Sequence, residues 1–169
     1  ANATSGVHFT TSSCTAGAIV DGNRVRDSLN GLLADSEGCC GTFSSNEVVY
    51  CQHGIHVTDA ADPIIRNNKI AHCGGVEQAA DLDRSGSMSS PKHVSGSSFV
   101  HHGSSISVSM NSGAGILATA GGKGMFEDNT LDVNARAGIH IATRANPILK
   151  GNIISGTFGD GVKVCDDGQ

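Results

Sequence analysis

The chain has 169 residues, with 11 basic and 16 acidic side chains and a net charge of −5. It has no basic run and no basic–aromatic patch, which argues against a nucleic-acid partner. No apolar stretch approaches the roughly 18 residues of a membrane span, and the first residues lack the apolar segment of a signal peptide. The length predicts one domain over residues 1–169.

A glycine followed by an apolar-x-apolar triplet recurs along the whole chain, with steps of 25, 23, 61, 23 and 23 residues. These positions are Gly6, Gly31, Gly54, Gly115, Gly138 and Gly161. An asparagine before an apolar residue follows the same period, at Asn23, Asn46, Asn68, Asn129 and Asn152. A fixed period of this length indicates a solenoid.

Apolar residues alternate over three to five positions inside each unit, as Ile139 and Ile141 do, and single apolar residues follow at Leu149 and Ile154. Short alternation between turn residues predicts β-strands, and the apolar stripe of a helical repeat is absent. The sequence therefore predicts an all-β fold, a parallel β-helix of about six rungs of ~23 residues stacked about 4.8 Å apart.

The recurring polar and glycine positions have physical reasons in such a fold. Asparagine tolerates the left-handed backbone of a sharp corner, and stacked asparagine side chains can hydrogen-bond from rung to rung. The glycines suit a turn into the first strand. Pro63 and Pro147 fall at the same place in two units, where a strand has ended.

The step of 61 residues indicates an insertion. Gly75 and Val76 look like a further rung start, which leaves 40 residues before Gly115. We therefore expect one more rung and an insertion of about 17 residues, the polar, serine-rich loop at 77–93.

The stretches "GGKGMFEDNTLDVNARAGIHIATRANPILKGNIISG" and "DPIIRNNKI" resemble the right-handed parallel β-helix repeats of carbohydrate-binding proteins and sugar hydrolases. They are most similar to the β-helix of the F-box substrate receptors of ubiquitin ligases, although no F-box is present. The resemblance implies a right-handed solenoid, in agreement with the usual hand of parallel crossovers. It also implies a non-catalytic binding or scaffold module with a protein partner.

Residues two positions after each glycine are expected to point outward from the first strand of every rung. This ladder consists of His8, Leu33, His56, Glu77, Leu117, His140 and Lys163. It predicts His56 beside Glu77 and His140 beside Lys163, which are candidates for acid–base chemistry or ligand binding. The alternative is a solvent-exposed strand face of mixed residues.

Carboxylates gather at two places, Asp59 and Asp62 in one turn and Asp81 and Asp83 in the insertion. Such groups could bind calcium or an acidic glycan, and the alternative is that they are solvated turn residues. The catalytic segments of pectin-degrading enzymes are missing, and Trp and Tyr, the usual sugar-stacking residues, are nearly absent. A carbohydrate-active enzyme or sugar-binding protein is therefore the second hypothesis for function, and no resident cofactor is expected.

Cysteine and histidine pairs complete the candidates. Cys51 and Cys73 each lie five residues after their asparagine, and Cys14 and Cys39 each lie eight after their glycine, so both pairs should stack. In-register Cβ atoms are too far apart for an easy bridge, which favours free thiols and an intracellular location, cytoplasmic or nuclear. A secreted, bridged protein is the alternative. The adjacent residues at 101–102 face opposite ways on a strand and cannot form a metal site alone.

The chain begins near a rung and stops just after "GVKV", residues 161–164, without a capping element. Because exposed solenoid ends are usually capped, we expect a fragment of a longer solenoid.

Overall fold

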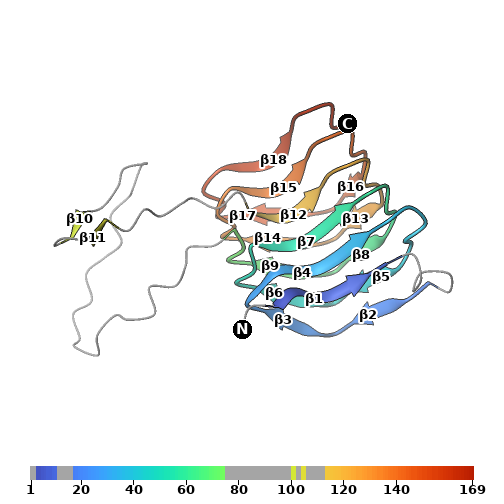
Figure 1. Ribbon diagram of the computed structural model, residues 1–169, viewed down its shortest axis with the longest axis horizontal. Helices are drawn as coiled ribbons and strands as arrows, with labels where there is room; N and C mark the ends of the chain where they lie inside the picture. Colours follow the sequence, from blue (N-terminus) through green and yellow to red (C-terminus); the bar gives the residue numbers. More distant parts are fainter. Residues whose placement is uncertain (1–2, 11–16, 75–99, 102–103, 106–112) are drawn as a thin grey trace.

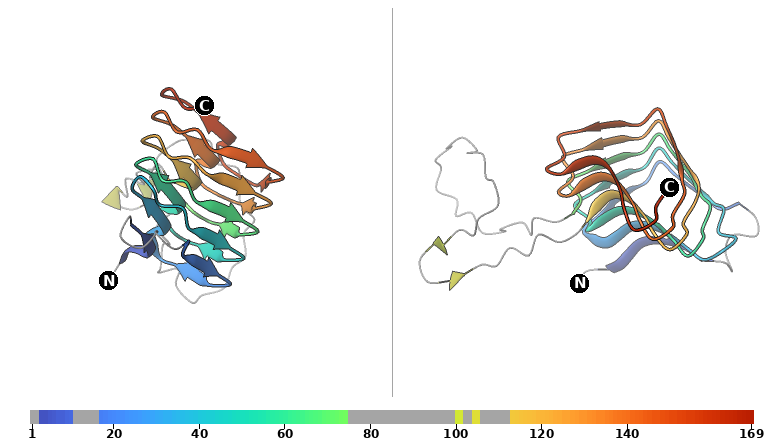
Figure 2. Two further views of the ribbon diagram at one scale, coloured as in Figure 1. Left: turned by 90° about the vertical axis from the view of Figure 1, so that its right-hand side faces the viewer. Right: turned by 90° about the horizontal axis from the view of Figure 1, so that it is seen from above.

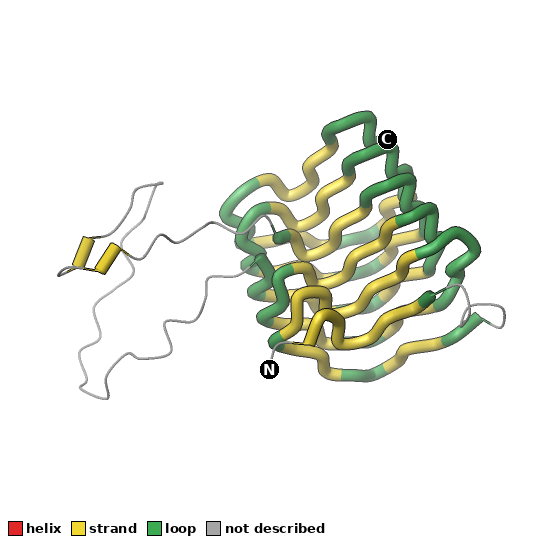
Figure 3. The backbone as a smooth tube through the Cα atoms, viewed as in Figure 1, coloured by secondary structure: helices red, strands yellow, loops and turns green. Residues whose placement is uncertain are grey.

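The computed structural model describes residues 3–10, 17–74, 100–101, 104–105 and 113–169. Three parallel sheets wind around one narrow interior (Figure 1; seen from above in Figure 2). Each full rung contributes one strand to each sheet, and turns and loops join the strands (Figure 3). The first sheet has six strands and the other two have five each, so the stack contains five full rungs and the first strand of a sixth. The predicted all-β parallel solenoid is confirmed.

The strands of the first sheet are β1 (Ala3–Phe9), β4 (Ser28–Asp35), β7 (His53–Thr58), β12 (Ala114–Ala118), β15 (Ala137–Ile141) and β18 (Asp160–Val164). Those of the second sheet are β2 (Ile19–Asp21), β5 (Thr42–Ser44), β8 (Ile64–Arg66), β13 (Met125–Glu127) and β16 (Ile148–Lys150). Those of the third are β3 (Arg24–Arg26), β6 (Glu47–Val49), β9 (Lys69–Ala71), β14 (Thr130–Asp132) and β17 (Ile153–Ser155). A separate antiparallel pair consists of β10 (Val100–His101) and β11 (Ser104–Ser105).

Apolar side chains of all three sheets fill the interior in register. Strand pairing aligns Leu32 with Ile55, Phe43 with Ile65, and Val48 with Ile70. The larger core side chains are fully buried, and they are Leu32, Phe43, Val48, Ile55, Ile65, Ile70, Ile116, Phe126, Leu131 and Ile139. Burying one such side chain contributes about 1.5–3 kcal/mol to the free energy of unfolding, so the repeated column is the main source of stability.

The predicted asparagine ladder is present at the corner between the second and third sheets. Asn68 shows the pattern: its Oδ1 accepts from the backbone N–H of Asn46 at 2.9 Å and from the Asn46 Nδ2 at 3.0 Å. Its own Nδ2 donates to Asn129 Oδ1 at 3.0 Å and to the carbonyl of Phe43 at 2.9 Å. The side chain thus satisfies buried backbone groups that the tight corner leaves unpaired.

The left-handed residue at this corner is one position earlier than expected. Positive φ angles of 54–67° occur immediately before the ladder asparagines, at Gly22, Ser45, Asn67, Asp128 and Gly151. The ladder asparagines are therefore selected for their hydrogen-bonding side chains, and the backbone bend is made by the preceding residue.

The glycines that recur once in each unit are also required for a different reason from the one that the sequence suggests. Gly54 and its equivalents lie within strands of the first sheet, and their φ angles are not positive. A Cβ atom on Gly54 would overlap the side chain of Ile70 and lie 2.5 Å from the carbonyl oxygen of Gly115. These glycines are needed because neighbouring rungs and the third sheet approach too closely for a side chain.

The expected rung start at Gly75 is wrong, because β7 pairs directly with β12 in the first sheet. The polypeptide therefore leaves the stack after Gly74 and rejoins it at Gly113, where a Cβ on Gly113 would overlap the Cα of Gly74. The whole segment 75–112 is inserted at one corner, and the smaller predicted loop at 77–93 lies outside the described residues.

Candidate binding face

The first sheet aligns the predicted outward ladder of side chains. The register joins His8, Leu33, His56, Leu117, His140 and Lys163. His140 lies beside Lys163, as predicted. The neighbours of His56 are Leu33 and Leu117, so its predicted place beside Glu77 is wrong, and Glu77 itself lies outside the described residues.

A second histidine of this face, His53, was missed by the sequence reasoning. Its ring centroid lies 5.6 Å from that of His56, although strict alternation would put residues three apart on opposite sides of a strand. The strand departs from strict alternation at Gly54, where an added Cβ atom would point into the core toward Ile70 and Cys73. The His-Gly dipeptide before an apolar triplet is the signal that could have found it.

We call this surface the histidine face; it is the outward side of the first sheet around His53, His56 and His140. Its floor is made of Ala114, Ala137 and Leu117, which form a small buried cluster. The two alanines occupy the same row as His53 in the next rungs, because β7, β12 and β15 pair in register. The imidazoles therefore stand over a low, apolar floor.

Burial favours the neutral form of all three imidazoles. Desolvation, together with the positive charge of His56 and His140, lowers the pKa of His53 to about 4. Desolvation also lowers the pKa of His56, against the opposing effect of Asp59 and Asp35. The pKa of His140 is lowered by desolvation and then by the charges of Lys163 and Arg136.

Hydrogen bonds hold the rings in place. His56 Nε2 lies 3.1 Å from Thr119 Oγ1, which donates to Thr58 Oγ1 at 3.3 Å. His140 Nε2 lies 3.2 Å from the sulfur of Cys165. At the first rungs, His8 Nε2 lies 2.7 Å from Asp35 Oδ2, and both side chains are partly exposed.

One polar atom of the face has no partner. Asn30 is 7% exposed and lies in register with His53, yet its Oδ1 accepts no hydrogen bond in the structure. A buried, unpaired acceptor costs about 1–3 kcal/mol of the free energy of unfolding, and this oxygen lies below the accessible surface of the face.

Asp59 is the described acidic candidate whose charge reaches this face, at His56. Asp59 has a φ of 51° in a tight turn closed by a hydrogen bond from Ala61 N to Thr58 O, and both Asp59 and Asp62 are exposed. Asp81 and Asp83 lie outside the described residues. Among the side chains that the structure describes, no three His, Cys, Asp or Glu come together as a metal site. The calcium and acidic-glycan alternatives stay predictions.

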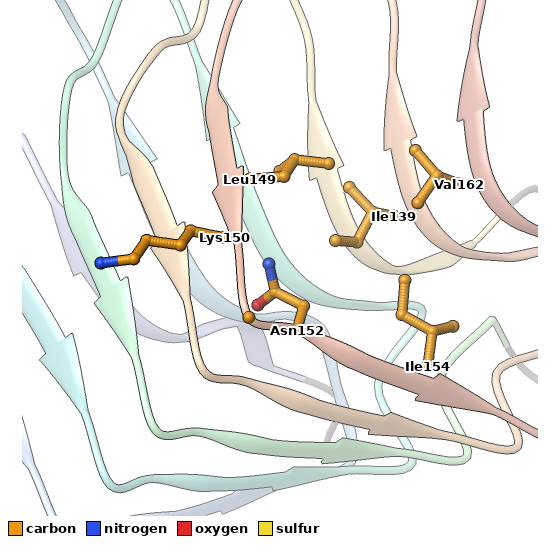
Figure 4. Close-up of a pocket in the computed structure, with 7 residues that line it drawn as sticks. Ile139, Leu149, Lys150, Asn152, Ile154 and Val162 are labelled. Atoms are coloured by element: carbon orange, nitrogen blue, oxygen red, sulfur yellow. The ribbon is translucent and has the colours of Figure 1, made fainter.

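A cavity of about 210 Å³ lies away from the histidine face, at the last rungs of the core. In Figure 4 its wall consists of Leu149, Asn152 and Ile154 on one side and Ile139 and Val162 on the other. These are the inward side chains of the solenoid, so the cavity is the open end of the core, and it has no convergent titratable groups.

The cysteines of the described part of the chain are free thiols. Cys51 and Cys73 stack in consecutive rungs, as predicted, and a hydrogen bond joins their side chains. This bond is the main cause of a lowered pKa at Cys51 and, with burial, of a raised pKa at Cys73. Cys39 is buried, and its predicted neighbour Cys14 lies outside the described residues.

The fold and its parallel register define a right-handed β-helix. The family model of the right-handed β-helix region matches residues 5–169, so the chain belongs to this family. No curated protein and no solved structure shows a significant match, and the predicted closeness to F-box receptors has no support from these comparisons. The described residues include no helix with the length and apolarity of a membrane span.

Proposed function

We propose that this domain is a non-catalytic binding module that recognises a protein partner through the histidine face. The observation behind the proposal is a row of half-buried, hydrogen-bonded imidazoles on the first sheet that stand over an apolar floor. The imidazole rings offer contacts to a partner, and Asp59, a described acidic candidate, acts on His56 through its charge.

The shape of the face supports a large partner. Six in-register strands extend about 24 Å along the solenoid, which is a suitable length for a protein interface. Small-molecule sites are usually concave, and the cavity described above lies at the end of the core instead.

The chemistry supports binding over catalysis. A glycosidase requires two carboxyl groups roughly 5–10 Å apart that flank the reacting bond. The carboxylates whose charges act on His56 are those of Asp35 and Asp59, and Asp35 is already engaged by His8 at 2.7 Å. His56 contacts the Thr119 hydroxyl, and His140 contacts the Cys165 thiol, so neither ring is hydrogen-bonded to a carboxylate that would activate it as a base. We therefore infer recognition without turnover.

The test is site-specific photo-crosslinking in cell extract with benzophenone side chains introduced at Lys163. A matched control position is Lys69, an exposed residue on the third sheet. A partner crosslinked only at the histidine face is then purified and its affinity measured. We expect His140→Glu to weaken its binding on the order of tenfold, and Lys69→Glu to leave it unchanged.

Two outcomes would contradict the proposal. One is a set of crosslinked proteins that is identical at both positions. The other is binding or cleavage of a uronate-rich polysaccharide that His140→Glu abolishes, because the carbohydrate-active alternative would then replace the protein-binding one.

A further inference from the structure

The outer face of the second sheet carries an unpartnered apolar column. The register aligns Ile19, Thr42, Ile64, Met125 and Ile148 on five consecutive strands. Ile64 is 40%, Met125 37% and Ile148 62% exposed. Figure 1 shows these strands, β2, β5, β8, β13 and β16, stacked along one side of the molecule. Large aliphatic side chains at this exposure form a contiguous stripe, which is typical of an interaction surface.

Charged side chains flank this stripe with opposite signs on neighbouring rungs. On one side, Asp62 precedes β8 and Lys123 occupies the equivalent position before β13. On the other side, Arg66 ends β8 and Glu127 ends β13 in register. Each row thus changes sign between the third and fourth rungs.

The charges are available for contact. In the described part of the chain, no ion pair or side-chain hydrogen bond engages Asp62, Arg66 or Lys123. Glu127 has only a long contact of 4.0 Å with Lys150. The Lys150 side chain is 72% and the Glu127 side chain 21% exposed, and a long surface pair of this kind contributes about 0–1 kcal/mol, so the carboxylate can exchange Lys150 for another cation.

We propose that this face binds a second copy of the same chain, in a dimer whose two-fold axis runs along the strands, midway between β8 and β13. This rotation reverses the order of the rungs in the second solenoid. Each outward row of side chains in one copy then lies opposite the same row in the other copy. The third rung of one copy then meets the fourth rung of the other. Such an interface is isologous, so every contact occurs twice.

This arrangement pairs every central group with a complementary one. Ile64 meets Met125 of the second copy, Arg66 meets Glu127, and Asp62 meets Lys123. Thr42 and Ile148 extend the apolar contact at the outer rungs. An apolar stripe between two rows of opposite charges has the layout of a small interface with a polar rim.

The interface is small, and the dimer is therefore weak. Four strands about 4.8 Å apart and three outward rows about 7 Å apart cover roughly 300–400 Å² per copy. Stable interfaces bury about 800 Å² per partner. We expect association that depends on protein concentration in the range of about 0.1–1 mM and weakens as salt screens the charged rows.

The experiment is sedimentation equilibrium over this concentration range with two single variants, Arg66→Glu and Glu127→Arg. Each variant places like charges across the axis, so each should be monomeric alone. In a mixture, the two acidic side chains of the first variant face the two basic side chains of the second across the axis. The mixture should therefore give a heterodimer of at least the wild-type affinity. This rescue requires no change within either chain and therefore separates dimer contacts from folding.

Lys69→Glu on the third sheet is the matched control, since it makes the same change of charge away from the interface. It should leave dimerisation unchanged, and circular dichroism should show the same fold for all variants. A wild-type chain that stays monomeric at about 1 mM, the upper end of the expected range, overturns the proposal. So does a dimer that persists in Arg66→Glu, or a mixture of the two variants that remains monomeric.

Discussion

His53 is held in a conformation that disfavours its charged form. Ala114, which lies in register on the adjacent strand β12, donates its backbone N–H to Nδ1 at 3.4 Å, and this assigns the proton of the neutral ring to Nε2. His56 lies against the same ring, so protonation of one imidazole opposes protonation of the other. Both effects favour the neutral ring, in agreement with the lowered pKa of His53.

We predict that the free energy of unfolding decreases as the pH falls from about 6.5 to about 4. The pKa of His53 is about 4 in the folded chain and 6.5 in an unfolded one, so the unfolded chain binds more protons in this interval. The full difference corresponds to about 3 kcal/mol. Urea unfolding of His53→Gln at several pH values should show a flatter dependence than wild type.

His72→Gln provides the control for this measurement, because His72 lies exposed at a corner, where its ring stacks on Tyr50. It should retain the wild-type pH dependence. An unchanged slope in His53→Gln would show that the dependence arises from other groups.

In the strands of the first sheet, the space between rungs limits which residue can occupy the recurring glycine position. The glycine of each strand faces the third sheet, and this requirement is strict in the middle of the stack. At the last rung it relaxes, since a Cβ on Gly161 would have Ile154 Cγ2 as its nearest neighbour at 3.9 Å. The same position in equivalent strands therefore differs in its tolerance.

Gly54→Ala should lower the free energy of unfolding by about 3 kcal/mol, because the methyl group overlaps Ile70 and the backbone of β12. Gly161→Ala should change it by less than about 0.5 kcal/mol. Thermal or urea unfolding of the two variants makes the comparison. Equal losses would mean that backbone conformation, and not space, selects the glycine.

Strand position and register were predictable from the sequence, whereas the details of corners and insertion were not. The 23-residue period aligns Gly115 with Gly138, because stacked strands must repeat their inward pattern. Cys51 and Cys73 align in the same way, although their spacing is one residue shorter than the period. The left-handed residue was placed one position late, since Asn67 and Asn68 are both asparagines and only one of them bends the backbone.

The insertion and the candidate site were also predicted only in part from the sequence. The sequence at Gly75 resembles a rung start because glycine before an apolar residue is a short, common pattern. The candidate site was predicted in part: alternation found His56 and His140, and the inward turn at Gly54 hid His53.

At the scale of the molecule, the insertion is separable from the solenoid. Joining Gly74 to Gly113 would place them where Ala135 and Arg136 stand in the next rung, and would restore a rung of 23 residues. The two ends of the insertion already meet at one corner of the stack. The chain can therefore close there without a new linker.

We predict that a variant lacking residues 75–112 folds into the same solenoid and unfolds cooperatively, with a free energy of unfolding within about 1 kcal/mol of wild type. Circular dichroism and urea unfolding check this. A matched deletion of equal length starting within β12 should not fold, because it removes core strands. Loss of structure in the first variant would mean that the insertion contributes to the core.

The stacking of parallel strands also determines how the molecule responds to force. The backbone hydrogen bonds between rungs run along the solenoid, and β1 and β18 lie at opposite ends of the first sheet. A pull on the two ends would therefore load one rung at a time, instead of shearing all strands together. Each regular rung that detaches would release about 23 residues and lengthen the tether by about 70–80 Å, whereas the rung that carries the insertion would release 61 residues and give one longer step of about 200 Å.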